Sequence, residues 1–314
     1  MDADDLALFE HSLRAATESS GDDLDALDAA LEKLGWQDAL SIDPHAAVST
    51  LFRLQGQANA TSSAISIVVC DALGVDDVMP VVMPALGHAQ PPGRMGGDGV
   101  GVVVRGLAMG AHGRALVVAA PDKAVTGTVA LGDLSRREIH GIDPALGLVE
   151  LTGEATFTEL GEGDWPLALA RAQLAVGHEL VGASRRMLEL AREHALNRIQ
   201  FGRPIATFQA VRHRLAETLV AVETADALLA AAWDDGLPQT AAMAKALAGR
   251  GARAAARHCQ QVLAGIGFTT EHDLHRYIRR VFVLDELFGS SARLTAQLGR
   301  DLLDTRQLPP VLPL

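Results

Sequence analysis

The sequence is poor in aromatic residues, in cysteine and in basic charge. Of its 314 residues 4% are aromatic and two are cysteines, and 39 acidic residues against 27 lysines and arginines give a net charge of −12. This balance argues against nucleic acid or an anionic membrane surface as the main partner. Cys70 and Cys259 lie in apolar helical stretches, so we expect reduced core residues of a cytoplasmic protein, with no disulfide and no metal site.

Long apolar runs are also missing. The N-terminus is acidic and lacks the pattern of a signal peptide, and no run is long enough to predict a membrane span. The chain still has 48% hydrophobic residues, enough for the core of one large or two modest domains. Because so few of them are aromatic, we expect a broad surface of Ala and Leu on helices, of the kind that a tetramer covers.

Apolar spacing predicts a mainly α protein with a small β-domain inserted in it. Helical periodicity is found in residues 4–17, 24–34 and 60–73, and again in 165–197, 208–233, 238–263, 274–288 and 291–303. Between these groups, short β-branched or alternating runs occupy residues 100–104, 115–120, 125–130 and 147–157. We therefore expect an N-terminal helical domain (1–80), a β-domain (81–160) and a C-terminal helical bundle (161–314). The Pro-rich end, Pro309 to Pro313, cannot be helical.

Three alternate glycines, Gly97, Gly99 and Gly101, invite comparison with the dinucleotide-binding fingerprint. That fingerprint requires a strand before the glycines and a helix after them. The local pattern predicts neither, so we do not assign these residues to a nucleotide site.

The connection between the two longest helices, residues 198–209 (RIQFGRPIATFQ), has more charged, amide and aromatic side chains than a turn requires. Glycine permits the chain to reverse at Phe201-Gly202-Arg203-Pro204, and proline fixes its exit. Arg198 suits the C-terminal end of a helix, and its guanidinium could equally hold a phosphate in bidentate fashion. Together with Gln200, Phe201 and Phe208 it could seat the pyrophosphate and adenine of a nucleotide. The alternative is a helix cap with two core phenylalanines.

A second stretch, residues 261–280, reads QVLAGIGFTTEHDLHRYIRR: the end of a helix with Gly265-Ile266-Gly267, a turn and a basic helix entry. Together the two stretches resemble the acyl-CoA dehydrogenase family, through its Arg-x-Gln-Phe-Gly turn and its Gln-x-x-Gly-Gly-x-Gly turn. Ala264 stands where the first glycine of the second turn would be. The resemblance is close from Trp165 to the end of the sequence and loose before it, where Leu34-Gly35-Trp36 and Gly141-Ile142-Asp143-Pro144 are similar to family signatures.

The resemblance implies FAD as cofactor, but residues 80–160 lack the family's Thr-Glu-Pro and Trp-x-Thr-Asn-Gly runs, which contact the flavin ring and the substrate carbonyl. The reaction also needs a carboxylate aimed at the α-carbon of the thioester. Phe288 stands where most members have that glutamate, and Ala172 stands at the other position used. We therefore expect no catalytic residue at either place. Asp285, Glu286, Glu179 and Glu271 are the nearest carboxylates, and we interpret each as a solvated helix or turn residue.

A chain that keeps the nucleotide-binding motifs but lacks the catalytic base resembles the small subunit of the actinobacterial α2β2 acyl-CoA dehydrogenases of steroid catabolism. That resemblance implies a longer homologous partner with the catalytic glutamate and an acyl-CoA substrate that is bulky or steroid-derived. In this chain, Arg198 would pair with the pyrophosphate of the partner's FAD. The adenosine end would meet Gln200, Phe201, Phe208 and Gln209, while Gln261 and Gly265 would offer an amide and close backbone approach.

Two other hypotheses stay open from the sequence. One is a homomeric dehydrogenase with a displaced carboxylate base such as Glu286, which would be yellow and would bleach with an acyl-CoA. The other is a flavin-free structural or CoA-binding protein that has kept only the fold.

Overall fold

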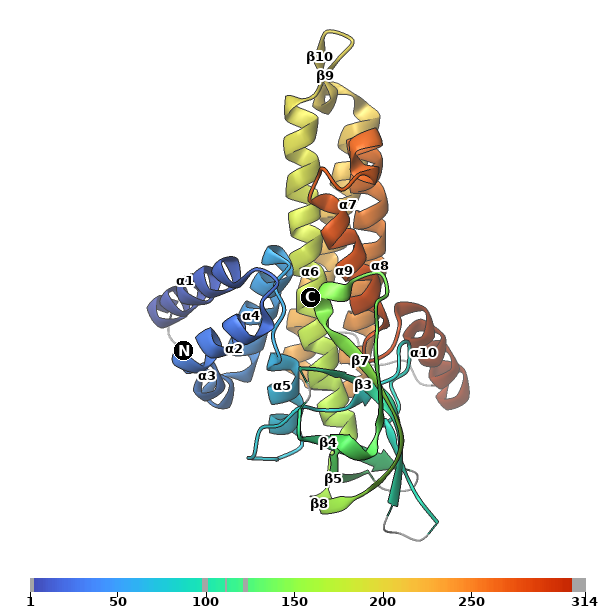
Figure 1. Ribbon diagram of the computed structural model, residues 1–314. Helices are drawn as coiled ribbons and strands as arrows, with labels where there is room; N and C mark the ends of the chain where they lie inside the picture. The colour runs from blue at the N-terminus through green and yellow to red at the C-terminus, as the bar shows by residue number, and fades with distance from the viewer. Residues whose placement is uncertain (1–2, 98–100, 111, 121–123, 307–314) are drawn as a thin grey trace.

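The computed structural model describes residues 3–97, 101–110, 112–120 and 124–306. A long helical bundle runs through the molecule, with a group of shorter helices on one side of it and a sheet packed beside its lower half (Figure 1). In this part of the chain, no helix combines the length and the apolar character needed to cross a membrane.

The N-terminal group has more helices than the sequence predicted. Its helices are α1 (Ala3–Ser20), α2 (Leu24–Lys33), α3 (Trp36–Ile42), α4 (Pro44–Ala58) and α5 (Ala64–Ala72). The predictions for α1 and α2 are confirmed, α5 is shorter than expected, and α3 and α4 were missed. The start of α4 is fixed by the side chain of Asp43, which accepts from the backbone N–H of Ala46, and by Pro44 in its first turn.

The middle part folds into a sheet, as predicted. Its strands are β1 (Met83–Pro84), β2 (Gly93–Met95), β3 (Gly101–Met109), β4 (Arg114–Ala120), β5 (Val125–Ala130), β6 (Ser135–Glu138), β7 (Leu148–Thr156) and β8 (Thr158–Glu162). The order is β6-β7-β3-β2-β4-β5-β8, with β1 on β3, and only the short β2–β4 pair is parallel among the described strands. The sheet has a small apolar cluster of its own, separate from the main core.

Of the three glycines, Gly97 follows β2 and Gly101 begins β3. A strand, β2, precedes Gly97 after all, but β3 begins at Gly101, so a strand follows in place of the helix that a nucleotide fingerprint requires. Gly99, Val100, Pro121 and Asp122 lie outside the described residues.

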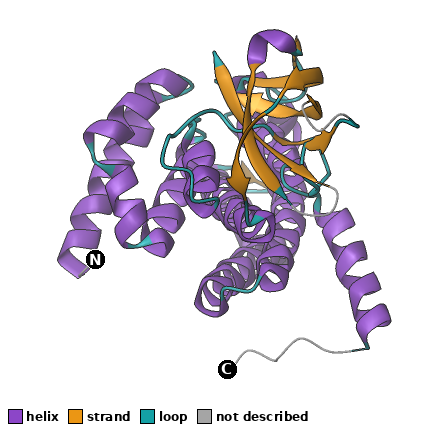
Figure 2. Ribbon diagram, turned by 90° about the horizontal axis from the view of Figure 1, so that it is seen from below, coloured by secondary structure: helices purple, strands orange, loops and turns teal. Residues whose placement is uncertain are grey.

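The C-terminal part is a helical bundle around one central helix. Its helices are α6 (Trp165–Asn197), α7 (Gln209–Asp235), α8 (Pro238–Leu263), α9 (Leu274–Glu286) and α10 (Ser291–Thr305). With 33 residues, α6 is about 50 Å long and packs against α4, α5, α7, α8 and α9. Figure 2 views the bundle nearly along its axis, with the sheet against one side. Cys70 and Cys259 are buried and unpaired in the main core, as predicted.

Close contact between α4 and α6 depends on glycine. A Cβ at Gly182 would lie 2.0 Å from the carbonyl oxygen of Arg53, and one at Gly56 would lie 2.1 Å from that of Glu179. Any side chain at either position would therefore force the two helices apart. These contacts join the N-terminal helices to the central helix and set the position of α6 against them.

Candidate functional site

The connection between α6 and α7 is a β-hairpin that protrudes from one end of the bundle (Figure 1). β9 (Ile199–Gln200) pairs with β10 (Arg203–Pro204), and the backbone N–H of Ile205 donates to the carbonyl of Arg198 at 2.9 Å. Phe201 and Gly202 form the two-residue loop with φ of 52° and 78°. Two positive φ values are typical of a type I′ turn, in which a non-glycine residue is strained. Pro204 lies in β10, and the next helix, α7, begins at Gln209, one residue after the predicted start at Phe208.

The hairpin presents its side chains to solvent. Phe201 is 91% exposed, and Arg198, Gln200 and Gln209 are exposed as well. The rings of Phe201 and Phe208 meet edge to face at 6.1 Å, and the guanidinium of Arg203 lies 4.5 Å from the centre of the Phe208 ring. Two core phenylalanines, the alternative interpretation, are therefore excluded for Phe201. Within the described residues, Arg198 has no carboxylate at ion-pair distance and remains available for an anion.

The second predicted motif lies at the same end of the bundle. α8 ends at Leu263, and a 3₁₀ turn (Ala264–Phe268) carries Gly265. Burial lowers the pKa of His194, and the electrostatic influence of His272 and Arg198 acts in the same direction, so His272 after α8 and Arg198 at the base of the hairpin both lie near the end of α6. Gln261 and Gly265 are exposed, and a Cβ at Gly265 would meet nothing within 4 Å. Packing inside this chain does not require glycine at that position.

Ala264 adopts a backbone conformation that favours glycine. Its φ is 52° with ψ of −131°, which costs an alanine on the order of 1–3 kcal/mol. Ala264 is thus a strained non-glycine residue next to the exposed Gly265.

Phe288 and Ala172, the two positions at which the resemblance places the family's base, lie together in the core. The side-chain amide of Gln173, the neighbour of Ala172 on α6, donates to the carbonyl of Phe288 at 3.0 Å. Ala172 and Phe288 are 0% and 1% exposed and belong to the main apolar cluster. Neither side chain can accept a proton. Phe288 has φ of 54° and Gly289 has φ of 102°, so this turn, like that of Ala264, has a strained non-glycine residue.

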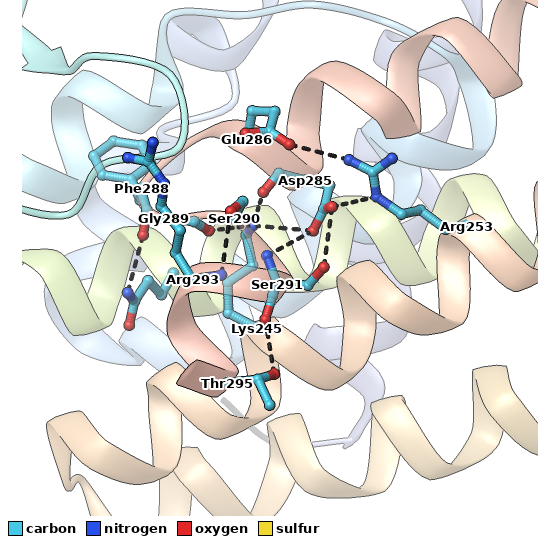
Figure 3. A network of polar contacts seen from close by, with 11 residues as sticks. Lys245, Arg253, Asp285, Glu286, Phe288, Gly289, Ser290, Ser291, Arg293 and Thr295 are labelled. Carbon is cyan, nitrogen blue, oxygen red and sulfur yellow. Dashed lines mark hydrogen bonds and ion pairs between the residues drawn. The ribbon is translucent and has the colours of Figure 1, made fainter. Parts of the chain in front are cut away.

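A buried polar network holds the turn that carries Phe288 (Figure 3). The ammonium of Lys245 donates to the carbonyls of Asp285 at 2.7 Å and Gly289 at 3.0 Å, bridging both ends of the turn. The Asp285 carboxylate accepts from Arg253 and from the backbone and hydroxyl groups of Ser291. Burial lowers the pKa of Lys245 to about 8, although Asp285 opposes the shift.

This network corrects an expectation from the sequence. Asp285 was interpreted as a solvated residue, yet it is 1% exposed, and Lys245 beside it is 0% exposed. Lys245 and Asp285 can both be buried because each is a polar partner of the other. Glu286 does lie at the surface, where its carboxylate pairs with Arg253 at 3.0 Å. Glu271 is exposed, as expected.

A second buried charge cluster surrounds Arg280. Its guanidinium pairs with Asp143 at 2.6 Å and with Glu179 at 3.4 Å, and it donates to the carbonyl of Ala60 at 2.7 Å and the hydroxyl of Thr61 at 2.9 Å. Burial raises the pKa of Glu179, although Arg280 acts in the opposite direction. Glu179 is thus not solvated either. The cluster ties the turn at Asp143, in the β part, to α6 and α9.

The interior beside these groups is nearly full. The cavity bounded by α4, α5, α6 and α9, with Gln55, Glu179 and Leu287 in its wall, measures about 10 Å³. That is room for about one water molecule. A larger cavity of about 720 Å³ lies elsewhere, between the first turns of α6 and α8 and the face of α10. Among the described residues, no group of three or more His, Cys, Asp or Glu is arranged to hold a metal ion.

The hairpin residues could be identified from the sequence, but the buried ion pairs that stabilise the core were missed. Arg203 was noted only as part of the turn, although its cation–π contact with Phe208 was signalled by the spacing in RPIATF. The Lys245–Asp285 and Arg280–Asp143 pairs join residues 40 and 137 positions apart. No local pattern signals contacts at such separations.

Comparison with known proteins agrees with this architecture. Residues 165–303 match the family model described as acyl-CoA dehydrogenase, C-terminal domain. The acyl-CoA dehydrogenase IpdE2 of Mycobacterium tuberculosis is 32% identical over 63% of this chain and 65% of its own length. The chain therefore spans less than two thirds of that curated relative.

Two solved structures are similar along nearly the whole chain. One is a variant of the steroid acyl-CoA dehydrogenase Tcur3481-Tcur3483, with a TM-score of 0.81, 21% identity, and coverage of 96% of this chain and 99% of that one. The other is the ChsE4-ChsE5 complex from Mycobacterium tuberculosis, with a TM-score of 0.78, 22% identity, and coverage of 99% and 100%. At such identities the likeness establishes the fold. Residues 165–303 thus match the C-terminal domain of the acyl-CoA dehydrogenase family, and the chain shares the fold of these two solved structures.

Proposed function

We propose that this chain is the base-less subunit of a heteromeric, FAD-dependent acyl-CoA dehydrogenase. Its residues contact the nucleotide part of an FAD whose flavin ring lies in a longer homologous partner. That partner supplies the catalytic glutamate. The observation that carries the proposal is the pairing of two apolar, buried side chains at both base positions, Phe288 and Ala172, with an exposed cationic and aromatic hairpin.

The hairpin residues fit the phosphate and adenosine end of FAD. Arg198 offers a guanidinium that has no carboxylate at ion-pair distance among the described residues, and a guanidinium binds phosphate oxygens in bidentate fashion. Phe201 offers a ring face that the rest of this chain leaves exposed, at a strained φ that indicates a role outside folding. Gln200, Gln209 and Gln261 add amides, and Gly265 leaves room for close approach. When bound, FAD would accept the hydride from the β-carbon of the thioester.

The interior of this chain also supports a partner that holds the substrate. Arg280, Glu179 and their partners fill the space between α4, α6 and α9 and leave about 10 Å³, too little for any part of an acyl thioester. The displaced-base alternative draws less support, because the carboxylate of Glu286 is held at the surface by Arg253. That pairing aims it at Arg253 on α8 and away from Phe288 (Figure 3).

The substrate class and the assembly are inferred from the similar proteins. One similar structure is titled a steroid acyl-CoA dehydrogenase and the other is a complex of two different chains. We infer an α2β2 assembly acting on a bulky or steroid-derived acyl-CoA by α,β-desaturation, in the cytoplasm.

Co-expression with the longer homologue tests the proposal. The isolated chain should be colourless and inactive, and the mixed complex should be yellow, with one FAD per pair of chains. Arg198→Ala in this chain should weaken FAD retention by about 10- to 100-fold, as expected for a lost charge-assisted contact of about 1.5–3 kcal/mol, without changing assembly. Arg192→Ala, which removes the same charge from an exposed position on α6, is the matched control.

Two results would end the proposal. An isolated chain that is yellow and bleaches with an acyl-CoA would establish the homomeric alternative. A mixed complex that keeps its full flavin content with Arg198→Ala and with Gln261→Ala would favour the flavin-free structural alternative for this chain.

A further inference from the structure

A cavity of about 720 Å³ lies at the start of α6, at the end of that helix opposite the hairpin. It is bounded by the first turns of α6 and α8, one face of α10 and the loop at residues 89–91. Cavities of about 300–1,000 Å³ with mainly apolar walls and a few polar groups are typical of small-molecule sites. The proposed function leaves this cavity without a role, and its lining residues decide which kind of molecule fits.

Apolar side chains form most of the wall. Trp165 and Leu169 come from α6, and Leu294 and Leu298 come from α10. The indole N–H of Trp165 donates to the carbonyl of Ala89 at 3.1 Å, so the ring is held in place and its one polar group already has a partner. Trp165 therefore adds a flat apolar surface to the wall. A molecule in this cavity is bound mainly through the apolar area that it buries.

One deeply buried polar side chain lines the same cavity. Gln173 is 1% exposed, and its amide nitrogen donates to the carbonyl of Phe288 at 3.0 Å. Because only the nitrogen can donate to that carbonyl, this hydrogen bond fixes the orientation of the amide. Among the described residues, no donor is hydrogen-bonded to the amide oxygen, Oε1. A buried acceptor without a donor is unfavourable, so Oε1 favours a ligand that brings a hydroxyl or an N–H group.

The charge of the wall disfavours an anionic ligand. Asp301, near the end of α10, is the only ionisable side chain among the described lining residues. Its carboxylate accepts from the side-chain amide of Gln297 at 2.7 Å. No lysine, arginine or histidine among these residues can balance a phosphate or a carboxylate, and an unbalanced charge in an apolar cavity is costly. The phosphate-bearing FAD and CoA of the proposed function therefore differ in kind from the molecule that this cavity fits.

We propose that the cavity between α6, α8 and α10 binds an uncharged, mainly apolar small molecule that carries a hydroxyl group. The apolar body of this molecule packs against Trp165, Leu294 and Leu298, and its hydroxyl donates to Oε1 of Gln173. A hydroxyl supplies the donor that Oε1 lacks without the desolvation cost of an ammonium group. The site is formed by this chain alone and does not depend on the proposed function.

Calorimetric titration of the full chain at pH 7 with three molecules of one shape tests the chemistry of the ligand. The probe is para-cyclohexylphenol, which is uncharged at this pH; its methyl ether lacks the donor, and para-cyclohexylbenzoate is an anion. The chain should bind the phenol, bind the ether at least about tenfold more weakly for want of one hydrogen bond, and leave the benzoate unbound. Absence of phenol binding, equal affinity for phenol and ether, or tighter binding of the benzoate overturns the proposal.

Substitutions in the full chain locate the bound phenol. Gln173→Met removes Oε1 and should abolish the preference for the phenol over its ether, a result that a general loss of stability does not produce. Leu298→Glu places a charge in the wall and should weaken phenol binding at least about tenfold. Leu303→Glu is the matched control, because Leu303 lies on the same helix, is exposed and is outside the wall. An equal effect of the two glutamates refutes the proposal even if Gln173→Met fails to fold, and so does an unchanged preference in a folded Gln173→Met.

Discussion

The pH dependence of stability should reveal the buried charge of Lys245. Its ammonium is fully buried, and its pKa of about 8 lies well below the ordinary 10.5. At about 1.4 kcal/mol per pH unit, this difference corresponds to about 3 kcal/mol. Below pH 8 the lysine is charged in both the folded and the unfolded chain, and the cost of its burial is constant. Between pH 8 and 10.5 the unfolded chain binds a proton that the folded chain lacks.

The sign of the effect follows from that proton. Stability rises with pH wherever the unfolded state binds more protons, so Lys245 should stabilise the fold progressively as pH rises through 8 toward 10.5. Lys245→Met removes this dependence. At pH 7 the substitution also removes the hydrogen bonds to the carbonyls of Asp285 and Gly289, which offsets the gain from losing a buried charge. The difference between the two proteins across pH is therefore more informative than either value alone.

Urea unfolding at pH 7, 8, 9 and 10 measures that difference. The unfolding free energy of the unsubstituted chain minus that of Lys245→Met should grow by about 2–3 kcal/mol from pH 7 to pH 10. Other titrating groups, including Cys259 with its pKa raised by burial to about 12, contribute equally to both proteins. Lys33→Met, at an exposed position in α2, should give a pH-independent difference. Parallel curves for Lys245→Met, or a difference that shrinks with pH, would refute the reasoning.

Three further substitutions in the core, with Gly299→Ala as a surface comparison, are tested by the same unfolding assay. Arg280→Met should cost about 3–5 kcal/mol, because it leaves two buried carboxylates without their partner; a loss below 1 kcal/mol would contradict this. Gly182→Ala should cost at least about 1–3 kcal/mol by overpacking, whereas Gly299→Ala, where a Cβ meets nothing within 4 Å, should stabilise α10 by about 1 kcal/mol. Phe288→Glu should cost about 3 kcal/mol or more and yield no dehydrogenase activity in the isolated chain, since it buries an unpaired carboxylate; activity would show that a base is all that is missing.

Local signals explain which elements could be predicted. The limits of α6 follow from a strong apolar period, an Asp164 cap before the first turn and the hairpin after Asn197, and the prediction matches the structure at both ends. α4 was missed although Asp43-Pro44 is a standard helix start, because the apolar spacing after it is interrupted by Arg53, Gln55 and Gln57. Its polar positions are explained only by partners elsewhere: Gln55, for example, accepts from Ser62.

The hairpin could be predicted as a feature because its candidate binding residues are contiguous in sequence. Its exposure to solvent could not be predicted. Periodicity describes which residues face a core; it does not tell whether a loop extends beyond the bundle. The buried charges were misassigned for a related reason. A lysine at position 245 of an Ala-rich helix is most simply solvated, and only the approach of Asp285 and the carbonyl of Gly289 makes its burial tolerable.

The turn at Phe288, where the proposed function places a missing base, has a strained shape. Phe288 and Gly289 both have positive φ, and a non-glycine residue there costs on the order of 1–2 kcal/mol. Packing can explain why the strain is tolerated. The N–H of Gly87 donates to the carbonyl of Glu286 at 2.7 Å, so the loop of the β part is hydrogen-bonded to this turn. Lys245 donates to the carbonyls of Asp285 and Gly289 and holds the turn from the other side. We infer that the turn joins the sheet to the bundle, and that this packing keeps its strained backbone in place.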